Sequence, residues 1–277
     1  MTNILDAKIV RDKLLNEYKE KIKNIEKKLK LVVIRVGDNP SSIIYVNSKR
    51  KVCEDIGILF EEIYFNENTK ENELIEKLEI LNKDANVTSI LVQLPLPNHI
   101  NPSNVINKID YKKDVDGLTF INIGKLLSGE DAIEACTAKG IISLLEFYNI
   151  SLESKNITII NRSTLIGKPL IPLLLNRNAT VTVCHSKTKN LSHHTKNADI
   201  IIVAVGKKDF LTKDMVSENV VVIDVGINKV DGKIYGDAHK DLIGYVDSIS
   251  PVPGGVGLMT VCSVAQNVYN CYKLQSK

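Results

Sequence analysis

Apolar residues recur at intervals of three or four along residues 10–29, which is the spacing of a helix with one buried face. The residues that carry this pattern are Val10, Leu14, Tyr18, Ile22, Ile25 and Leu29, and lysines lie between them. Short runs rich in β-branched residues follow at 31–36, 58–65 and 89–93, separated by helical stretches at 43–56 and 71–81. This alternation predicts a parallel sheet covered by helices.

A second alternation begins after the charged segment 114–117, which we expect to be a hinge. It contains a helix near 140–147 and strands at 156–160, 180–184, 200–205 and 220–225. These strands are almost continuously apolar, as in parallel sheets that are covered on both faces. A last helical stretch at 258–274 follows a glycine-rich interruption. The pattern therefore predicts an α/β protein with two domains.

Composition narrows the classes of partner. With 277 residues, 44% of them hydrophobic and 25% charged, the chain can bury a core in each of about two domains. The net charge of +3 is too small to indicate nucleic acid, which is usually bound by a clustered basic surface. We therefore expect a small acidic ligand and no nucleic acid.

Cysteine usage and apolar runs indicate the compartment. The five cysteines are widely spaced and contain no C-x-x-C pair, so neither a disulfide framework nor a zinc site is indicated. The start of the chain does not look like a signal peptide, and the apolar run at 200–205 is far shorter than a membrane span. We expect a cytoplasmic protein that binds no membrane. The histidines lack the spacing and the nearby carboxylates of a metal site, so we expect no metal.

A nucleotide site is indicated where the strand at 156–160 runs into a turn and an apolar helix. Helix starts in this context bind pyrophosphate groups. The turn contains Gly167 but no G-x-G-x-x-G pattern, so an ordinary strand-to-helix connection stays open.

Charge provides a second indication of a nucleotide. No acid occurs between Glu153 and Asp199, whereas seven basic residues do: Lys155, Arg162, Lys168, Arg177, Lys187, Lys189 and Lys196. An NAD site usually has an acid about 20 residues after its glycine loop, to bind the ribose 2′-hydroxyl. Here His185, Ser186 and Lys187 follow the second strand instead, which favours the 2′-phosphate of NADP. A solvated basic face is the alternative.

Tyr45 and Lys49 lie four residues apart on a predicted helix and therefore share a face. Tyr-x-x-x-Lys is also the catalytic motif of short-chain dehydrogenases. In that family the motif follows the nucleotide-binding turn, whereas here it precedes the turn by more than a hundred residues. The chain order therefore argues against that assignment.

Four motifs occur in one order along the chain. They are Tyr45-Val-Asn-Ser-Lys49, Val92-Gln-Leu-Pro-Leu-Pro97, Lys113-Asp-Val-Asp-Gly117 and Pro251-Val-Pro-Gly-Gly-Val-Gly257. In this combination the chain resembles the bifunctional methylenetetrahydrofolate dehydrogenase/cyclohydrolase family over nearly its whole length. The resemblance implies two α/β domains flanking a cleft, the second a Rossmann-like doubly wound parallel sheet, commonly in a homodimer. We expect residues 1–118 and 250–277 to form the folate-binding catalytic domain, and 119–249 the NADP-binding domain.

The resemblance also implies roles for individual residues. Lys49 matches the catalytic lysine, Tyr45 the tyrosine that stacks on the folate, Gln93 the glutamine that hydrogen-bonds the lysine, and Asp116 the aspartate that holds the pterin. A carboxylate suits that last role because it can accept two adjacent N–H groups of the pterin edge. The expected cofactor-binding residues are Asn161, Arg162, Ser163, Ile166, Gly167, His185 and Ser186.

The glycine loop, residues 251–257, is the last candidate for substrate binding. Pro253, Gly254, Gly255 and Gly257 allow a backbone to approach a flat ring closely. On composition alone, a turn that only joins two domains is an equal interpretation.

The expected function is NADP-dependent oxidation of 5,10-methylenetetrahydrofolate to the methenyl compound, followed by its hydrolysis to 10-formyltetrahydrofolate. The sequence departs from the family pattern at Asn161, where the family often has glycine, and at Ala135, Ala138 and Leu258, where it has proline. Asparagine tolerates the backbone of such a turn, but its side chain can crowd the cofactor. Two alternatives follow: a cyclohydrolase with impaired dehydrogenase activity, and a non-catalytic NADP-binding sensor.

Overall fold

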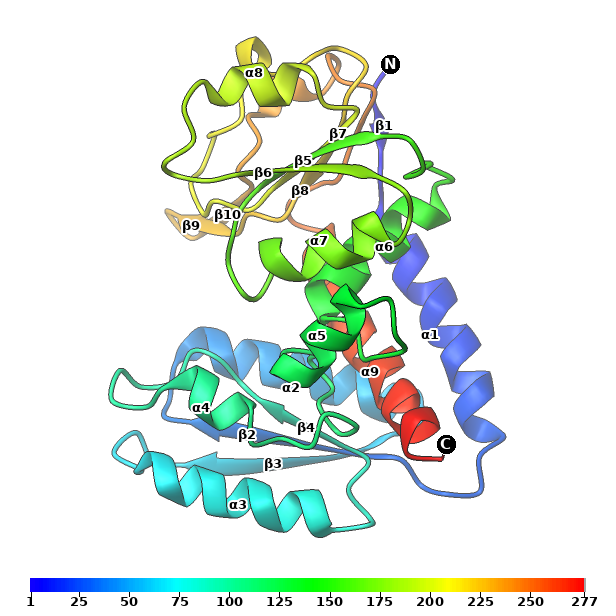
Figure 1. Ribbon diagram of the computed structural model, residues 1–277, viewed down its shortest axis with the longest axis vertical. Helices are drawn as coiled ribbons and strands as arrows, with labels where there is room; N and C mark the ends of the chain where they lie inside the picture. Colours follow the sequence, from blue (N-terminus) through cyan, green and yellow to red (C-terminus); the bar gives the residue numbers. More distant parts are fainter. Residues whose placement is uncertain (277) are drawn as a thin grey trace. The chain divides into compact units, whose positions relative to one another are not determined.

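A computed structural model describes residues 1–276 of the chain, and Figure 1 shows its helices and strands. The chain forms two compact units. Unit 1 combines Met1–Asp12 with Thr137–Thr260, and unit 2 combines Lys13–Cys136 with Val261–Lys277. The unit boundaries fall in α1 (Ala7–Lys23), at the start of α6 (Cys136–Phe147) and in α9 (Val256–Gln275).

These packing units differ from the expected domains in three short stretches. Residues 1–12 and 250–260 pack with the expected nucleotide domain, and residues 119–136 pack with the expected folate domain. The expected hinge at 114–117 lies inside unit 2 rather than at a boundary. The assignment of folate and NADP to particular domains stays a prediction.

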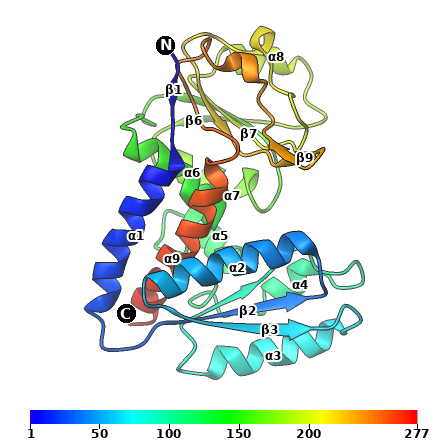
Figure 2. The same cartoon turned by 180° about the vertical axis from the view of Figure 1, so that it is seen from behind.

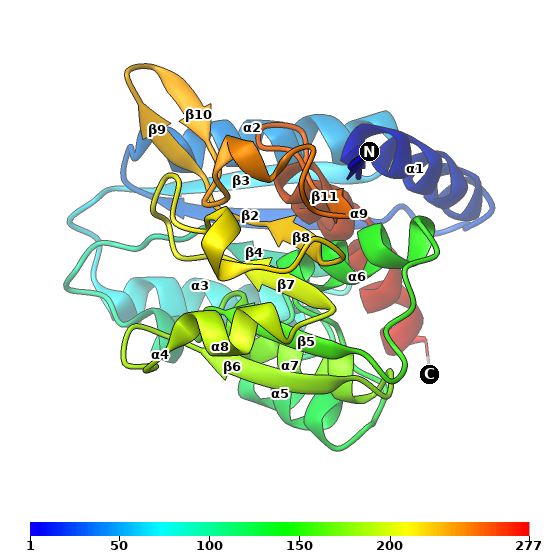
Figure 3. The same ribbon diagram turned by 90° about the horizontal axis from the view of Figure 1, so that it is seen from above.

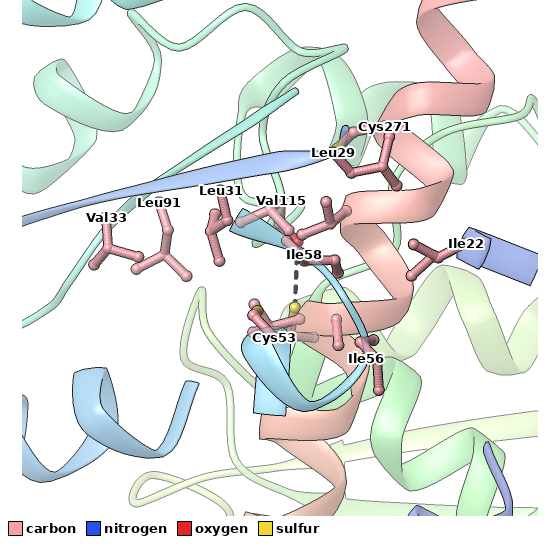
Figure 4. Packing of buried hydrophobic residues seen from close by; sticks show 14 of the residues in the cluster. Ile22, Leu29, Leu31, Val33, Cys53, Ile56, Ile58, Leu91, Val115 and Cys271 are labelled. Carbon is pink, nitrogen blue, oxygen red and sulfur yellow. Dashed lines mark hydrogen bonds between the residues drawn. The ribbon is translucent and has the colours of Figure 1, made fainter. Parts of the chain in front are cut away.

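Unit 2 is built on a three-stranded parallel sheet in the order β3-β2-β4. Successive residues of the central strand β2 point to opposite faces of a sheet. Leu31 and Val33 therefore pack in one buried cluster, shown in Figure 4, whereas Val32 and Ile34 pack in another. Helix α2 covers the first face and α3 covers the second, as Figures 1 and 2 both show. The elements of unit 2 are β2 (Lys30–Val36), α2 (Pro40–Asp55), β3 (Leu59–Phe65), α3 (Glu71–Lys83), β4 (Ser89–Val92), α4 (Pro102–Ile106) and α5 (Phe120–Leu127).

The first helix is shorter than the apolar spacing predicts. It ends at Lys23, although the pattern continues to Leu29. The Asn24 side chain donates a hydrogen bond to the carbonyl of Glu20 at this end. Ile25 and Leu29 still pack into the core, but from the connection that leads into β2. Periodicity therefore identified buried residues correctly and extended the helix too far.

Unit 1 contains a six-stranded parallel sheet in the order β1-β11-β8-β7-β5-β6 (Figure 3). The chain passes from β5 outward to β6 and then returns to β7 on the other side of β5. This reversal makes the carboxyl ends of β5 and β7 the switch point where doubly wound sheets bind ligands. The predicted α/β class and the doubly wound parallel sheet are confirmed.

The elements of unit 1 include several that periodicity did not predict, above all the antiparallel hairpin of β9 and β10 and the short strands β1 and β11. Strands of two or three residues are too short to show an alternating pattern. The elements are β1 (Asn3–Ile4), β5 (Asn156–Ile160), α7 (Gly167–Leu175), β6 (Thr180–Cys184), α8 (Leu191–Lys196), β7 (Ile200–Val203), β8 (Val221–Asp224), β9 (Asn228–Val230), β10 (Lys233–Tyr235), β11 (Ser248–Ile249) and the 3-10 turns Lys213–Met215 and Lys240–Leu242.

Candidate functional site

The central contact of unit 2 joins Lys49 to Gln93. Helix α2 starts directly after the carboxyl end of β2, where Asn39 accepts hydrogen bonds from the backbone N–H groups of Ser41 and Ser42. Lys49 lies on the buried face of this helix and is only 6% exposed. Its Nζ donates a hydrogen bond of 2.9 Å to Oε1 of Gln93. A buried ammonium group needs such a partner to offset its lost hydration.

Gln93 is held at the carboxyl end of β4. Its backbone N–H donates to the carbonyl of Ile34 on the neighbouring strand at 2.8 Å. Its side-chain Nε2 donates to the carbonyl of Leu94 at 2.7 Å. Because the amide nitrogen is occupied there, the amide oxygen faces Lys49. The structure therefore brings these two predicted residues together in the expected contact.

Asp116 lies at the same edge of the sheet, because the segment before it pairs with β4. The apolar periodicity did not predict this pairing. The backbone N–H of Ile90 donates to the carbonyl of Lys113, and that of Val115 donates to the carbonyl of Ile90. The segment around Asp114 thus forms a parallel bridge to β4. Asp116 lies two residues beyond this bridge, as Gln93 lies just beyond β4, so both are at the carboxyl edge of the sheet.

Asp114 fixes the turn that carries Asp116. It is 1% exposed and accepts hydrogen bonds from the backbone N–H groups of Gly117 and Thr119 and from the side chain of Asn122. Burial raises the pKa of Asp114 from its ordinary value despite these donors. Gly117 has φ of +67°, and a Cβ there would lie 2.6 Å from the carbonyl oxygen of Ile133. The Asp-x-Asp-Gly spacing signals this turn, but sequence reasoning missed the role of Asp114.

Tyr45 precedes Lys49 by about one turn of α2, or roughly 6 Å along the helix axis. Its ring is half-buried, and this burial raises the pKa of its hydroxyl. Within residues 1–276, no hydrogen bond joins Tyr45 or Asp116 to the pair of Lys49 and Gln93. Their side chains are partly exposed, as groups that contact a ligand need to be.

The glycine loop follows β11 of unit 1 and leads directly into α9. It contains a cis peptide bond between Val252 and Pro253, and Gly254 adopts a φ of +102°. The predicted residues of this loop and those around Lys49 therefore belong to different packing units.

A cavity of about 350 Å³ opens in unit 1 at the switch point of the sheet. Five of the seven predicted cofactor-binding residues line it: Asn161, Arg162, Ser163, His185 and Ser186. The predicted residues Ile166 and Gly167 do not. Sequence reasoning missed the other lining residues: Ile160, Leu191, Ala204, Val205 and Phe210. All five are apolar: Ile160 ends β5, Leu191 begins α8, and the other three lie in loops, so their apolar character alone does not distinguish them from core residues.

The turn after β5 satisfies its own hydrogen-bond donors. Oδ1 of Asn161 accepts from the backbone N–H groups of Ser163 at 2.7 Å and Gly167 at 3.0 Å. The Ser163 hydroxyl accepts from the N–H of Ile166, and the Ser163 carbonyl accepts from the N–H of Lys168. These four N–H groups are therefore not available to a pyrophosphate. The start of α7 does not offer the open set of donors that the strand-turn-helix pattern indicated.

The charges around this cavity suit an anionic ligand. Arg162 is exposed at its rim, and no acidic side chain lines it in the described part of the chain. Ser186 and His185 lie at the end of β6, where an NAD site would have an acid. The donor set fits a phosphate on the 2′-oxygen of a ribose.

Among residues 1–276, no group of three or more His, Cys, Asp or Glu side chains is arranged to hold a metal ion. None of the described helices is both long enough and apolar enough to cross a membrane.

Comparisons with known proteins decide the family. Residues 5–116 match "Tetrahydrofolate dehydrogenase/cyclohydrolase, catalytic domain", and residues 135–276 match "Tetrahydrofolate dehydrogenase/cyclohydrolase, NAD(P)-binding domain". The chain belongs to the tetrahydrofolate dehydrogenase/cyclohydrolase family. The resemblance predicted from the four motifs is confirmed.

Curated relatives match this chain over nearly its full length. The bifunctional protein FolD of Francisella philomiragia is 49% identical over 259 residues, which cover 93% of this chain and 91% of the relative. FolD of a Hydrogenobaculum species is 47% identical over 275 residues, covering 98% and 99%. The chain is therefore a bifunctional methylenetetrahydrofolate dehydrogenase and methenyltetrahydrofolate cyclohydrolase with an NAD(P)-binding domain.

Solved structures show the same fold. The bifunctional enzyme FolD from Campylobacter jejuni has a TM-score of 0.97 at 44% identity and covers 99% of this chain and 100% of its own. The enzyme from Trypanosoma brucei, solved in complex with NADP and an inhibitor, has a TM-score of 0.92 at 29% identity, covering 100% and 99%.

The carboxyl edge of unit 1 also contains a buried acid that the motifs did not predict. Asp224 ends β8 and is 3% exposed. Its carboxylate accepts hydrogen bonds from the backbone N–H groups of Gly226, Asp237 and Ala238. Loss of hydration outweighs these donors and raises the pKa of Asp224 to about 6.

This shift predicts a pH dependence of stability. Between pH 4 and 6, Asp224 holds a proton in the folded chain but not in the unfolded chain, so its contribution to the free energy of unfolding falls as the pH rises. At about 1.4 kcal/mol per pKa unit, the fall amounts to about 3 kcal/mol. Urea unfolding at pH 4, 5, 6 and 7 should show that the wild type loses this much relative to Asp224→Asn. Parallel pH curves for the two proteins would refute the shift.

Proposed function

We propose that hydrolysis of the methenyl compound takes place at Lys49 and Gln93 in unit 2, and that the cavity of unit 1 binds NADP in preference to NAD. The hydrogen bond between these two side chains carries the first proposal, because it places a nearly buried amine at the carboxyl edge of the sheet. The phosphate-compatible lining of the cavity supports the second.

Lys49 suits the proton transfers of the cyclohydrolase step. The methenyl carbon is an electrophilic amidinium carbon, and water that attacks it must lose a proton while the ring nitrogen gains one. An amine held by a neutral amide can exchange protons, because Gln93 orients it without forming an ion pair. The general effect of such proton transfer is on the order of 10²–10⁴ in rate.

Asp116 and Tyr45 are proposed to bind the folate. The Asp116 carboxylate can accept two neighbouring N–H groups of the pterin, and the firmly held turn around Asp114 limits its movement. The half-buried ring of Tyr45 offers a flat surface for stacking. We propose Pro253, Gly254, Gly255 and Gly257 as further folate contacts, through backbone that a flat ring can approach.

The NADP proposal rests on Arg162, Ser186 and His185. A guanidinium and a hydroxyl bind a phosphate through charge-assisted hydrogen bonds, whereas an NAD site would use an acid. NADP, when bound, accepts the hydride from the methylene carbon. Asn161, Ser163, Ile166 and Gly167 are proposed to shape the cofactor site rather than to donate to its pyrophosphate, because their polar groups bond to one another.

The two alternatives to this proposal differ in which of the two enzyme activities they lack. Asn161 raised the possibility of a cyclohydrolase with impaired dehydrogenase activity or of an NADP-binding sensor. Its side-chain oxygen and nitrogen both form hydrogen bonds with backbone groups of the protein. This observation and the two-domain family match favour the bifunctional enzyme.

Two assays separate these functions. Incubation with methylenetetrahydrofolate and NADP measures reduction of NADP, and incubation with methenyltetrahydrofolate alone measures hydrolysis. The bifunctional enzyme gives both activities. Hydrolysis without NADP reduction would indicate the cyclohydrolase with impaired dehydrogenase activity. No activity in either assay would indicate the sensor.

Assembly and location belong to the same proposal. We propose a homodimer, as the family resemblance implies, and sedimentation equilibrium of the purified chain tests it. We also propose a cytoplasmic enzyme. All five cysteine side chains are buried, which is consistent with thiols in a reducing compartment.

Replacing Lys49 should separate the two activities. In Lys49→Met the rate of methenyltetrahydrofolate hydrolysis should fall by at least about 100-fold, because the proton carrier is gone. The dehydrogenase rate should fall by less than about tenfold, because hydride transfer needs no proton carrier at the carbon. Lys51→Met is the matched control, since Lys51 lies on the exposed part of the same helix. Equal losses of both rates would contradict this division of roles.

Replacing Arg162 should change the choice of cofactor. In Arg162→Ala, kcat/KM with NADP should fall by about tenfold or more, whereas the value with NAD should change by less than about twofold, since NAD lacks the 2′-phosphate. Lys168→Ala is the control, because Lys168 is exposed nearby but does not line the cavity. An unchanged NADP/NAD ratio in Arg162→Ala would show that the phosphate binds elsewhere.

A further inference from the structure

A buried carboxylate binds the backbone of the loop that follows β7. Asp237 is fully buried, and its oxygens accept hydrogen bonds from three successive backbone N–H groups. The distances are 2.5 Å from Val205, 3.0 Å from Gly206 and 2.8 Å from Lys207. The side chain of Asn228 donates a fourth hydrogen bond at 2.9 Å.

Such a set of successive N–H groups is an arrangement that commonly binds a phosphate or another anion. In this chain the anion is the protein's own carboxylate. The loop at residues 204–207 is therefore shaped before any ligand arrives. Ala204 and Val205 of this loop line the cavity proposed for NADP.

Asp237 is itself held tightly in place. Asp224 accepts hydrogen bonds from the backbone N–H groups of Asp237 and Ala238, at 2.9 Å and 2.8 Å. The packing leaves no space beside them, because a Cβ at Gly236 would lie 1.9 Å from Oδ2 of Asp224. The carboxylate of Asp237 therefore cannot move away from the loop without disturbing the carboxyl ends of β7 and β8.

A second side chain also binds this loop. Nδ2 of Asn161 donates a hydrogen bond of 2.5 Å to the carbonyl of Ala204. The same side chain accepts hydrogen bonds from the backbone N–H groups of Ser163 and Gly167 in the turn after β5. Asn161 thus connects the two loops that line the cavity, and Asp237 binds the backbone of the second loop.

We propose that Asp237 is a positioning residue for the cofactor: its buried carboxylate, together with the amide of Asn161, holds the 204–207 loop in the shape that binds NADP. A loop that is already ordered spares the cofactor the entropy cost of ordering it. This inference rests on the proposed NADP site. It also implies that a cofactor site depends on preorganised loops when the N–H groups at its helix start are already hydrogen-bonded.

Calorimetric titration with NADP tests the proposal. The Kd for NADP should rise by about tenfold or more in Asp237→Asn, because an amide presents an N–H group to the backbone donors of the loop. Hydrolysis of methenyltetrahydrofolate, assayed without NADP, should stay within about twofold of the wild-type rate, which excludes general unfolding as the cause.

Asp199→Asn is the matched control. Asp199 also accepts a hydrogen bond from a backbone N–H group, that of Asn156, but at the amino end of β5. The Kd of Asp199→Asn for NADP should equal that of the wild type. Failure of the wild type to bind NADP would overturn the proposed function, whereas normal binding by both wild type and Asp237→Asn would overturn the role of Asp237 alone.

A second variant covers the case in which Asp237→Asn does not fold. Asn161→Ala removes the hydrogen bond to Ala204, together with those from Ser163 and Gly167, and should also raise the Kd for NADP. If both variants fold, the double variant should raise it by less than the product of the two single effects, because both act through one loop. An unchanged Kd in Asn161→Ala, or effects that multiply, would contradict the proposal.

Discussion

The hydrogen bond from Lys49 to Gln93 is the interaction on which the catalytic unit depends. Lys49 as a whole residue is only 6% exposed, and a buried ammonium group without a hydrogen-bond partner would be strongly destabilising. A neutral amide oxygen compensates part of that loss without neutralising the amine. The sheet places the amide at the end of β4, and helix α2 places the amine beside it. The fold of unit 2 thus keeps the amine that we propose as the proton carrier in a nearly buried position.

The nucleotide unit follows a different principle. Its turn after β5 and its loop after β7 use their own backbone donors internally, through Asn161 and Asp237. In the proposed function, specificity for the cofactor comes instead from cavity-lining side chains such as Arg162 and Ser186. Asn161, which departs from the usual glycine, is part of this internal network.

The sequence predicted the fold class well because long strands and helices have distinct periods. The runs at 31–36 and 156–160 both form interior strands with buried side chains. The contact of Lys49 with Gln93 came from resemblance to a family, since periodicity does not show which loop lies beside which helix. Asp224 and Asp237 were missed for the same reason, whereas the role of Asp114 was missed although the local Asp-x-Asp-Gly spacing signals its turn. Each binds backbone N–H groups of a loop, and in the case of Asp237 the donors are about thirty residues away in sequence.

Cyclohydrolase kcat/KM in Gln93→Glu and Gln93→Met tests the central claim most directly. A carboxylate beside Lys49 would form an ion pair with the ammonium group and hold its proton, whereas Met offers no hydrogen-bond acceptor. We expect the rate of hydrolysis to fall by about tenfold or more in both variants, while the dehydrogenase rate changes by less than about threefold. A wild-type rate of hydrolysis in Gln93→Glu would contradict the claim that Lys49 needs a neutral amide beside it.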